Sequence, residues 1–121
     1  MTTTLAPRGF HGFIRATLIG TILQLALVVG GHSAPAIAQL FAPLGMLISL
    51  VAGFLAGRWQ AGTRLGAVVL GGVAGGLCAF LGILESYYLK DVPAWVLAFG
   101  PASSALTGAI GGFLGSLGKR A

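Results

Sequence analysis

The chain has 121 residues, of which 56% are apolar and only 7% are charged, and its mean hydropathy is +0.96. Soluble domains carry about 25% charged residues, so this composition excludes a water-soluble fold, and it also excludes intrinsic disorder, which requires low hydrophobicity. The net charge of +5 comes from basic residues that lie between apolar blocks. Because they form no single basic face, they do not indicate nucleic-acid binding. We therefore predict one integral membrane domain over residues 1–121.

Four apolar stretches are each long enough to cross the hydrocarbon core of a bilayer, which takes about 20 helical residues. Lipid offers no partners to backbone polar groups, so the spanning segments must be helices. We predict an all-α bundle of four transmembrane helices, in which short links make consecutive helices antiparallel. The predicted helices cover residues 13–31, 36–57, 65–84 and 94–117.

The start of the chain also has the features of a secretory signal peptide. Arg8 and Arg15 precede an apolar run, and Ala36-Ile37-Ala38 matches the A-x-A pattern of a cleavage site. The same three residues fit the start of the second predicted helix. We expect the first stretch to be retained as a span, because Ala36 also has a counterpart in an internal repeat.

The basic residues predict the orientation of the four helices. Six of the seven fall on one predicted side, namely Arg8, Arg15, Arg58, Arg64, Lys119 and Arg120. Lys90 falls on the other side, beside Glu85 and Asp91. These three residues either cap helices, bind a partner or form a solvated, salt-bridged loop. Since cytoplasmic loops are enriched in Lys and Arg, both termini are predicted to lie in the cytoplasm.

Two copies of one helical hairpin are visible in the sequence. Pro35 and Pro93 are 58 residues apart, as are Pro43 and Pro101. Ala36 and Phe41 have counterparts at the same offset. The predicted repeat halves are residues 13–58 and 64–117. Because both halves start on the same side, the repeat is a parallel 2+2 arrangement.

Pro43 and Pro101 lie eight residues after the prolines that open their predicted helices. An internal proline removes one backbone hydrogen bond and clashes with the carbonyl four residues earlier, so we predict kinks at both positions. The freed carbonyls of Gln39 and Leu97 either contribute to an ion or substrate site or are satisfied by neighbouring groups as simple packing kinks.

Small residues recur every four positions on the second, third and fourth predicted helices. Close backbone approach holds helices together in lipid, and small residues permit it. The density of these residues predicts contact with another chain or with lipid, although a GC-rich genome would also enrich glycine and alanine. The predicted helix-packing or partner surface consists of Gly53, Gly57, Gly71, Gly72, Gly75, Gly76, Ser104, Gly108, Gly112 and Ser116.

Few residues are suited to chemistry. The sequence has no nucleophile set on one predicted side and no paired carboxylates in a span, and His11 and His32 are predicted to lie on opposite sides. We therefore predict no enzymatic activity, no metal site and no intrinsic cofactor, while lipid or the cofactor tails of a partner can contact the chain. Cys78 lies in an apolar stretch, which favours a packing role.

A few polar side chains fall within the predicted spans. Gln24 and Gln39 are candidates for hydrogen bonds between helices. Ser103, Ser104 and Thr107 follow Pro101. They either line a polar groove or bond the backbone of their own helix.

The stretch Ala52–Leu77, AGFLAGRWQAGTRLGAVVLGGVAGGL, resembles small glycine-rich four-helix membrane proteins of prokaryotes. This resemblance implies a multi-pass protein of a bacterial inner membrane and transfers no activity. From the residues we expect a non-catalytic accessory subunit of a larger membrane complex, for example respiratory or photosynthetic, whose partners are lipids and other subunits or itself. The alternative is a small homo-oligomeric channel or transporter with a site near Pro43 and Pro101.

Overall fold

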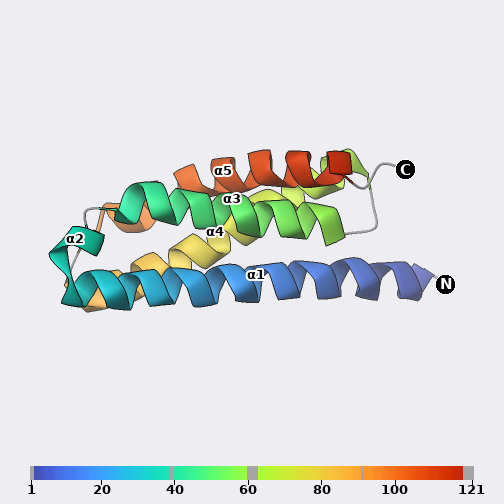
Figure 1. Cartoon of the computed structure of the whole chain (residues 1–121). Helices are drawn as coiled ribbons and strands as arrows, with labels where there is room; N and C mark the ends of the chain where they lie inside the picture. The colour runs from blue at the N-terminus through green and yellow to red at the C-terminus, as the bar shows by residue number, and fades with distance from the viewer. Residues whose placement is uncertain (1, 39, 60–62, 91, 119–121) are drawn as a thin grey trace.

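The computed structural model describes residues 2–38, 40–59, 63–90 and 92–118, and within these ranges it is helical and has no strand. The prediction of an all-α protein is confirmed. The elements are α1 (Thr2–Ser33), α2 (Pro35–Ala38), α3 (Phe41–Trp59), α4 (Arg64–Tyr88) and α5 (Val96–Gly118). Figure 1 shows the four longer helices lying alongside one another in one elongated bundle. Four residues named in the predictions, Gln39, Asp91, Lys119 and Arg120, lie outside the described residues, as does the side chain of Arg8.

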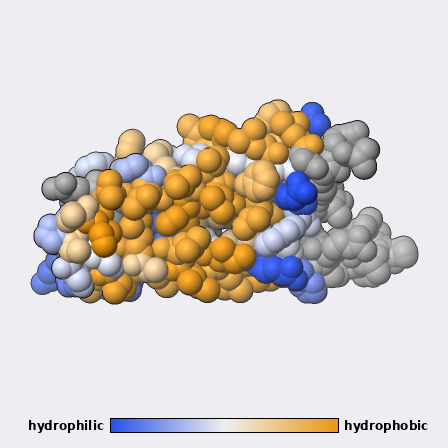
Figure 2. All heavy atoms as spheres, in the orientation of Figure 1, coloured by the Kyte–Doolittle hydropathy of each residue, from blue (hydrophilic) through white to orange (hydrophobic). Residues whose placement is uncertain are grey.

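Three helical segments of the described chain are long and apolar enough to cross a membrane: His11–Ser33, Arg64–Tyr88 and Val96–Leu117. A shorter apolar segment, Pro43–Trp59, lies in α3. Figure 2 shows the result on one face of the molecule, where an apolar surface covers the middle and hydrophilic residues lie toward the two ends.

The second predicted helix, residues 36–57, is interrupted in the structure. The chain forms the four-residue helix α2 and then a separate helix, α3, that begins at Phe41. The Leu40 N–H bonds the Ile37 carbonyl at 2.9 Å and the Leu44 N–H bonds the Leu40 carbonyl at 2.9 Å, which ends one helix and starts the next. Pro43 therefore lies in the first turn of α3, and the predicted kink inside a continuous helix is wrong at this position. A proline in a first turn breaks no hydrogen bond of its helix.

α1 and α4 extend beyond their predicted limits at both ends, whereas α5 begins two residues later than predicted and ends one residue later. α1 begins at Thr2, eleven residues before the predicted start, because helix formation does not depend on an apolar sequence. α4 begins after Thr63, whose hydroxyl accepts a hydrogen bond from the Gly66 N–H at 3.0 Å. It continues to Tyr88, and the chain then leaves the helix at Lys90, whose φ is 65°.

The bundle has two different ends (Figure 1). One end contains the start of α1, the last residues of α5, and Arg15, Arg58 and Arg64, and we call it the arginine end. The opposite end carries α2 and the α4–α5 connection, and we call it the α2 end. α4 and α5 share the largest contact surface, followed by α3 and α5, while α1 packs against α3 and α4.

Candidate functional site

Glycines form the contact among α3, α4 and α5. A Cβ placed on Gly53 or Gly57 would collide with the backbone of Gly108 or Gly112, with Cα atoms at 2.7 Å in both cases. On α4, a Cβ on Gly71 would lie 2.7 Å from the Gly112 Cα, and one on Gly75 would lie 2.8 Å from the Gly108 Cα. We call this set, Gly53, Gly57, Gly71, Gly75, Gly108 and Gly112, the glycine contact. Six of the ten residues predicted for packing thus face one another within a single chain.

The remaining four predicted packing residues have different surroundings. Ser104 and Ser116 are buried on α5, and the Ser116 hydroxyl bonds the Phe113 carbonyl at 2.7 Å. Gly72 and Gly76 are only partly buried on α4. Both face α5, where a Cβ on Gly72 would lie 3.2 Å from the Ala105 carbonyl oxygen and one on Gly76 would lie 3.0 Å from the Ala105 Cβ. They also line a shallow apolar groove between α4 and α5, together with Val68, Val69, Val73, Leu77, Ala105 and Ala109.

The first helix also approaches its neighbours closely through glycines, which the sequence patterns did not indicate. A Cβ on Gly20 would lie 2.8 Å from the Ala52 Cβ and 2.9 Å from the Cys78 Sγ, so α1, α3 and α4 meet at this residue. Gly12 lies against Trp59 in the same way. The face of α1 that carries the bulky residues Leu18 and Ile22 is exposed.

Gln24 connects three helices through one amide nitrogen. Its Nε2 donates to the Gly45 carbonyl at 3.1 Å, to the Ser49 hydroxyl at 3.3 Å and weakly toward the Cys78 Sγ at 3.9 Å. Ser49 in turn donates to the Gly75 carbonyl at 3.2 Å. The prediction of interhelical bonds is confirmed for Gln24, and Cys78 is buried in this packed region.

Only one of the two paired prolines lies inside a helix. Pro101 is an internal residue of α5, whereas Pro43 belongs to the first turn of α3. After Pro101, Ser103 donates to the carbonyls of Phe99 and Gly100 at 3.0 and 3.1 Å, and Thr107 donates to the Ser103 carbonyl at 2.9 Å. Both residues therefore bond the backbone of their own helix, and Ser103 also lies in the wall of a cavity.

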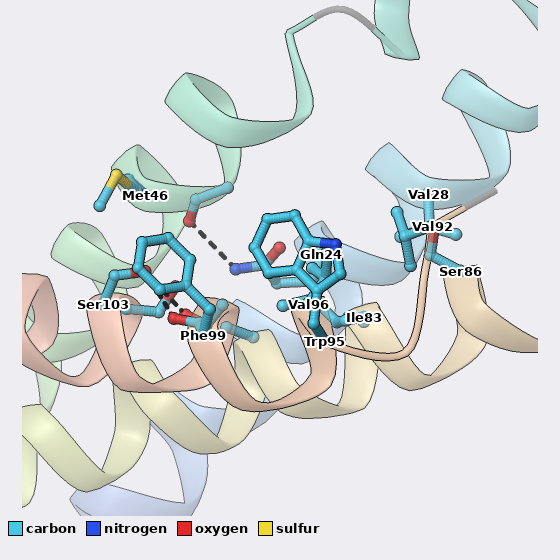
Figure 3. A pocket seen from close by; sticks show the side chains of 15 residues that line it. Gln24, Val28, Met46, Ile83, Ser86, Val92, Trp95, Val96, Phe99 and Ser103 are labelled. Carbon is cyan, nitrogen blue, oxygen red and sulfur yellow. Dashed lines mark hydrogen bonds between the residues drawn. The ribbon is translucent and has the colours of Figure 1, made fainter.

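A cavity of about 300 Å³ lies between the helices at the α2 end. All four longer helices contribute to its wall, as does the connection that holds Val92 and Trp95. Gly45 and Met46, shortly after Pro43, line the cavity, as do Phe99, Gly100, Ser103 and Ser104 on either side of Pro101. Figure 3 labels Met46, Phe99 and Ser103 among them. The cavity therefore lies near the two prolines at which the channel or transporter alternative placed its site.

The described wall of this cavity carries no charged side chain. Trp95 and Phe99 stand at its exposed rim, with ring centroids 5.8 Å apart. Gln24 is 5% exposed and Ser86 is 2% exposed, and the Ser86 hydroxyl has no hydrogen-bond partner among the described residues. An unpartnered buried hydroxyl is costly in an apolar surrounding, so Ser86 marks this part of the wall as able to accept a polar group.

Sequence patterns did not identify Ser86, Trp95 or the cavity itself. Trp95 had the pattern of an interfacial aromatic residue, and Ser86 stood next to a charged cluster without a periodic signal. The described residues include no group of three or more His, Cys, Asp or Glu that could hold a metal ion. Comparison with known proteins finds no matching family model, no matching curated protein and no matching solved structure.

Proposed function

We propose that the chain is a four-span protein of a bacterial inner membrane that acts as a non-catalytic accessory subunit of a larger membrane complex. Three apolar helices of spanning length support the membrane location. α3 has 19 residues, and at about 1.5 Å per residue its length approaches the ~30 Å hydrocarbon core. Apolar side chains exposed on the helices would contact lipid.

Both termini are proposed to face the cytoplasm. α1 begins and α5 ends at the arginine end (Figure 1), and an excess of Arg and Lys favours the cytoplasmic side. Reporter fusions test this orientation. A fluorescent protein fused to the C-terminus should be bright, and alkaline phosphatase fused there should be inactive. The opposite pair of results would reverse the proposed orientation.

The observation that carries the subunit proposal is the uncovered groove between α4 and α5. The glycine contact is occupied within the chain, and Gly72 and Gly76 face Ala105 on α5. The shallow apolar groove that these two glycines line between α4 and α5 has no helix over it in the described chain. Its floor of glycine and alanine would allow the backbone of another helix to approach closely, which is the main source of helix association in lipid. A partner helix from another subunit therefore fits this surface.

Purification in a mild detergent followed by native mass spectrometry tests this proposal. Val73→Phe should obstruct the groove and release the partner, because Val73 is half-exposed on its wall. Ile22→Phe is the matched control, since Ile22 is exposed on α1, away from the groove. A chain that purifies without any partner, or a partner that both variants retain, would contradict the proposal.

The second candidate is a small homo-oligomeric channel or transporter, and the cavity near Pro101 favours it. A cavity opening beside an internal proline is a feature of transporters with interrupted helices. Liposome flux of small solutes should then occur in the wild-type protein and fall in a variant that carries Pro43→Ala and Pro101→Ala. Flux that is absent, or that is unchanged in this variant, would remove the transport candidate and leave the subunit proposal intact.

A further inference from the structure

We infer that the cavity at the α2 end binds one uncharged, mostly apolar molecule that carries a hydrogen-bond donor, such as a phenol or an aliphatic alcohol. The inference deepens the transport candidate by naming the ligand class of its cavity. The volume, the apolar wall and the chemistry of the wall's polar atoms each restrict the ligand.

The volume sets the size of the molecule. Binding pockets for small molecules begin at about 300 Å³, and an apolar cavity of about 150 Å³ already holds benzene. The present cavity, at about 300 Å³, is therefore large enough for a substituted aromatic ring or a short alkyl chain. Its rim residues Trp95 and Phe99 offer aromatic faces to such a group (Figure 3).

The polar atoms of the wall favour a donor on the ligand. The Gln24 Nε2 is directed toward Gly45 and Ser49 on α3, so the amide presents its oxygen to the cavity side (Figure 3). That Oε1 lies between Gly45 and Gly82, 3.6 Å from where a Cβ would stand on either residue. Ser103 already uses its proton on the α5 backbone, so its hydroxyl can only accept. Two acceptors thus face a space whose described wall has no charge.

Ser86 adds a group that can satisfy the ligand's oxygen. Its hydroxyl is buried without a partner, and it belongs to the wall of the same cavity. A ligand hydroxyl can donate to one wall atom and accept from another, which an alkane or benzene cannot do. An ionised ligand would lose its hydration here without gaining an opposite charge, so charged analogues are disfavoured.

Heavy-atom quenching of Trp95 fluorescence tests the inference in the full chain reconstituted in detergent or nanodiscs. Trp59→Phe leaves Trp95 as the only tryptophan, and Trp95→Phe leaves only Trp59. Trp59 lies at the arginine end, where the Arg15 guanidinium lies over its ring. The probes are 4-bromophenol, bromobenzene and 4-bromobenzoate, which share the quenching bromine and differ in donor and charge. Quenching that reflects simple partitioning into lipid is linear in probe and equal for the two tryptophans.

The phenol should quench Trp95 with saturation, and its half-saturating concentration should be about two- to tenfold lower than that of bromobenzene, as expected for one net hydrogen bond. The benzoate should be the weakest of the three. Trp59 should show only linear quenching. Linear quenching of Trp95 by all three probes would overturn the inference, and equal binding of phenol and bromobenzene would overturn the donor requirement.

Variants that fill the cavity connect the signal to this site. Ser103→Leu and Gly45→Val add volume from two different helices, and a Cβ on Gly45 meets no atom closer than 3.6 Å. Both should abolish saturable quenching. Ala102→Leu, on the adjacent exposed position of α5, should retain it. Saturable binding that survives in both filled variants, with helical content unchanged by circular dichroism, would overturn the assignment.

Binding without any solute flux would remove the transport candidate and keep the inference.

Discussion

The two halves of the bundle are built from the same few residue types, but the glycines of α3 have different surroundings in each half. Toward the arginine end, the glycine contact brings the backbones of α3, α4 and α5 so close that a single added carbon at Gly53 or Gly57 would collide with main-chain atoms. Toward the α2 end, a Cβ on Gly45 of the same helix α3 would meet nothing closer than 3.6 Å, and a cavity of about 300 Å³ separates the helices. Along α3, glycine therefore serves close packing at Gly53 and Gly57 and leaves space at Gly45, so its frequency alone does not reveal its role.

The largest expected effect compares Gly53→Ala with Gly45→Ala. Both changes gain about 1 kcal/mol of helix propensity. At Gly53 the new methyl group would stand 2.7 Å from the Cα of Gly108, so α3 and α5 must separate, and we expect a net loss of about 1–3 kcal/mol in unfolding free energy. At Gly45 we expect no loss or a small gain.

Unfolding in increasing SDS, followed by circular dichroism, measures this difference. Equal stability of the two variants would mean that the two halves do not differ in packing.

The hydrogen bonds of Gln24 connect the two halves, and their loss should have an intermediate effect. Gln24→Leu removes the bonds to Gly45 and Ser49, and Ser49→Ala removes one partner. Single bonds of this kind in membranes contribute about 0.6 kcal/mol on average and up to about 1.7 kcal/mol. We expect Gln24→Leu to reach the upper part of this range. The double variant in a thermodynamic cycle should show a coupling near the average, and purely additive losses would mean that the two side chains act independently.

The smallest effect is expected at the arginine end, where two cations lie over aromatic rings. The Arg64 guanidinium carbon is 5.8 Å from the ring centroid of Phe113, and that of Arg15 is 5.5 Å from the ring centroid of Trp59. Exposed pairs of this type contribute about 0.5–1 kcal/mol.

Phe113→Leu keeps an apolar side chain and removes the ring, so the same SDS assay should show a loss within that range. The loss should disappear when Arg64 is already replaced by Gln. A loss that persists in the Arg64→Gln background would assign it to packing of the ring.

The parts of the fold that sequence predicted are those governed by average hydropathy and spacing. The absence of charge from long apolar runs was enough to predict the helices, and the four-residue spacing on α3, α4 and α5 was enough to find the glycines that face one another. The break after α2 was not predicted, because a hydropathy pattern does not distinguish a proline in the first turn of a helix from a proline in its interior. The two prolines differ in their distance from the helix start: α3 begins two residues before Pro43, whereas α5 begins five residues before Pro101.

The sequence predicted the approximate position of the candidate site but not its cavity or its wall residues. Two prolines in equivalent positions indicated the region around Gly45 and Ser103, but the cavity depends on how far apart four helices lie, which no local pattern encodes. Ser86 illustrates the limit: it is buried and lies in a cavity wall to which four helices contribute, and its own neighbours in sequence carry no signal of that position.

The chain's single thiol, Cys78, sits at the junction of α1, α3 and α4, where Gly20 and Gln24 cover it. A maleimide can reach that sulfur only when the helices move apart. The rate at which a maleimide modifies the wild-type protein therefore reports how often the helices separate around Cys78, and the measurement requires no engineered cysteine.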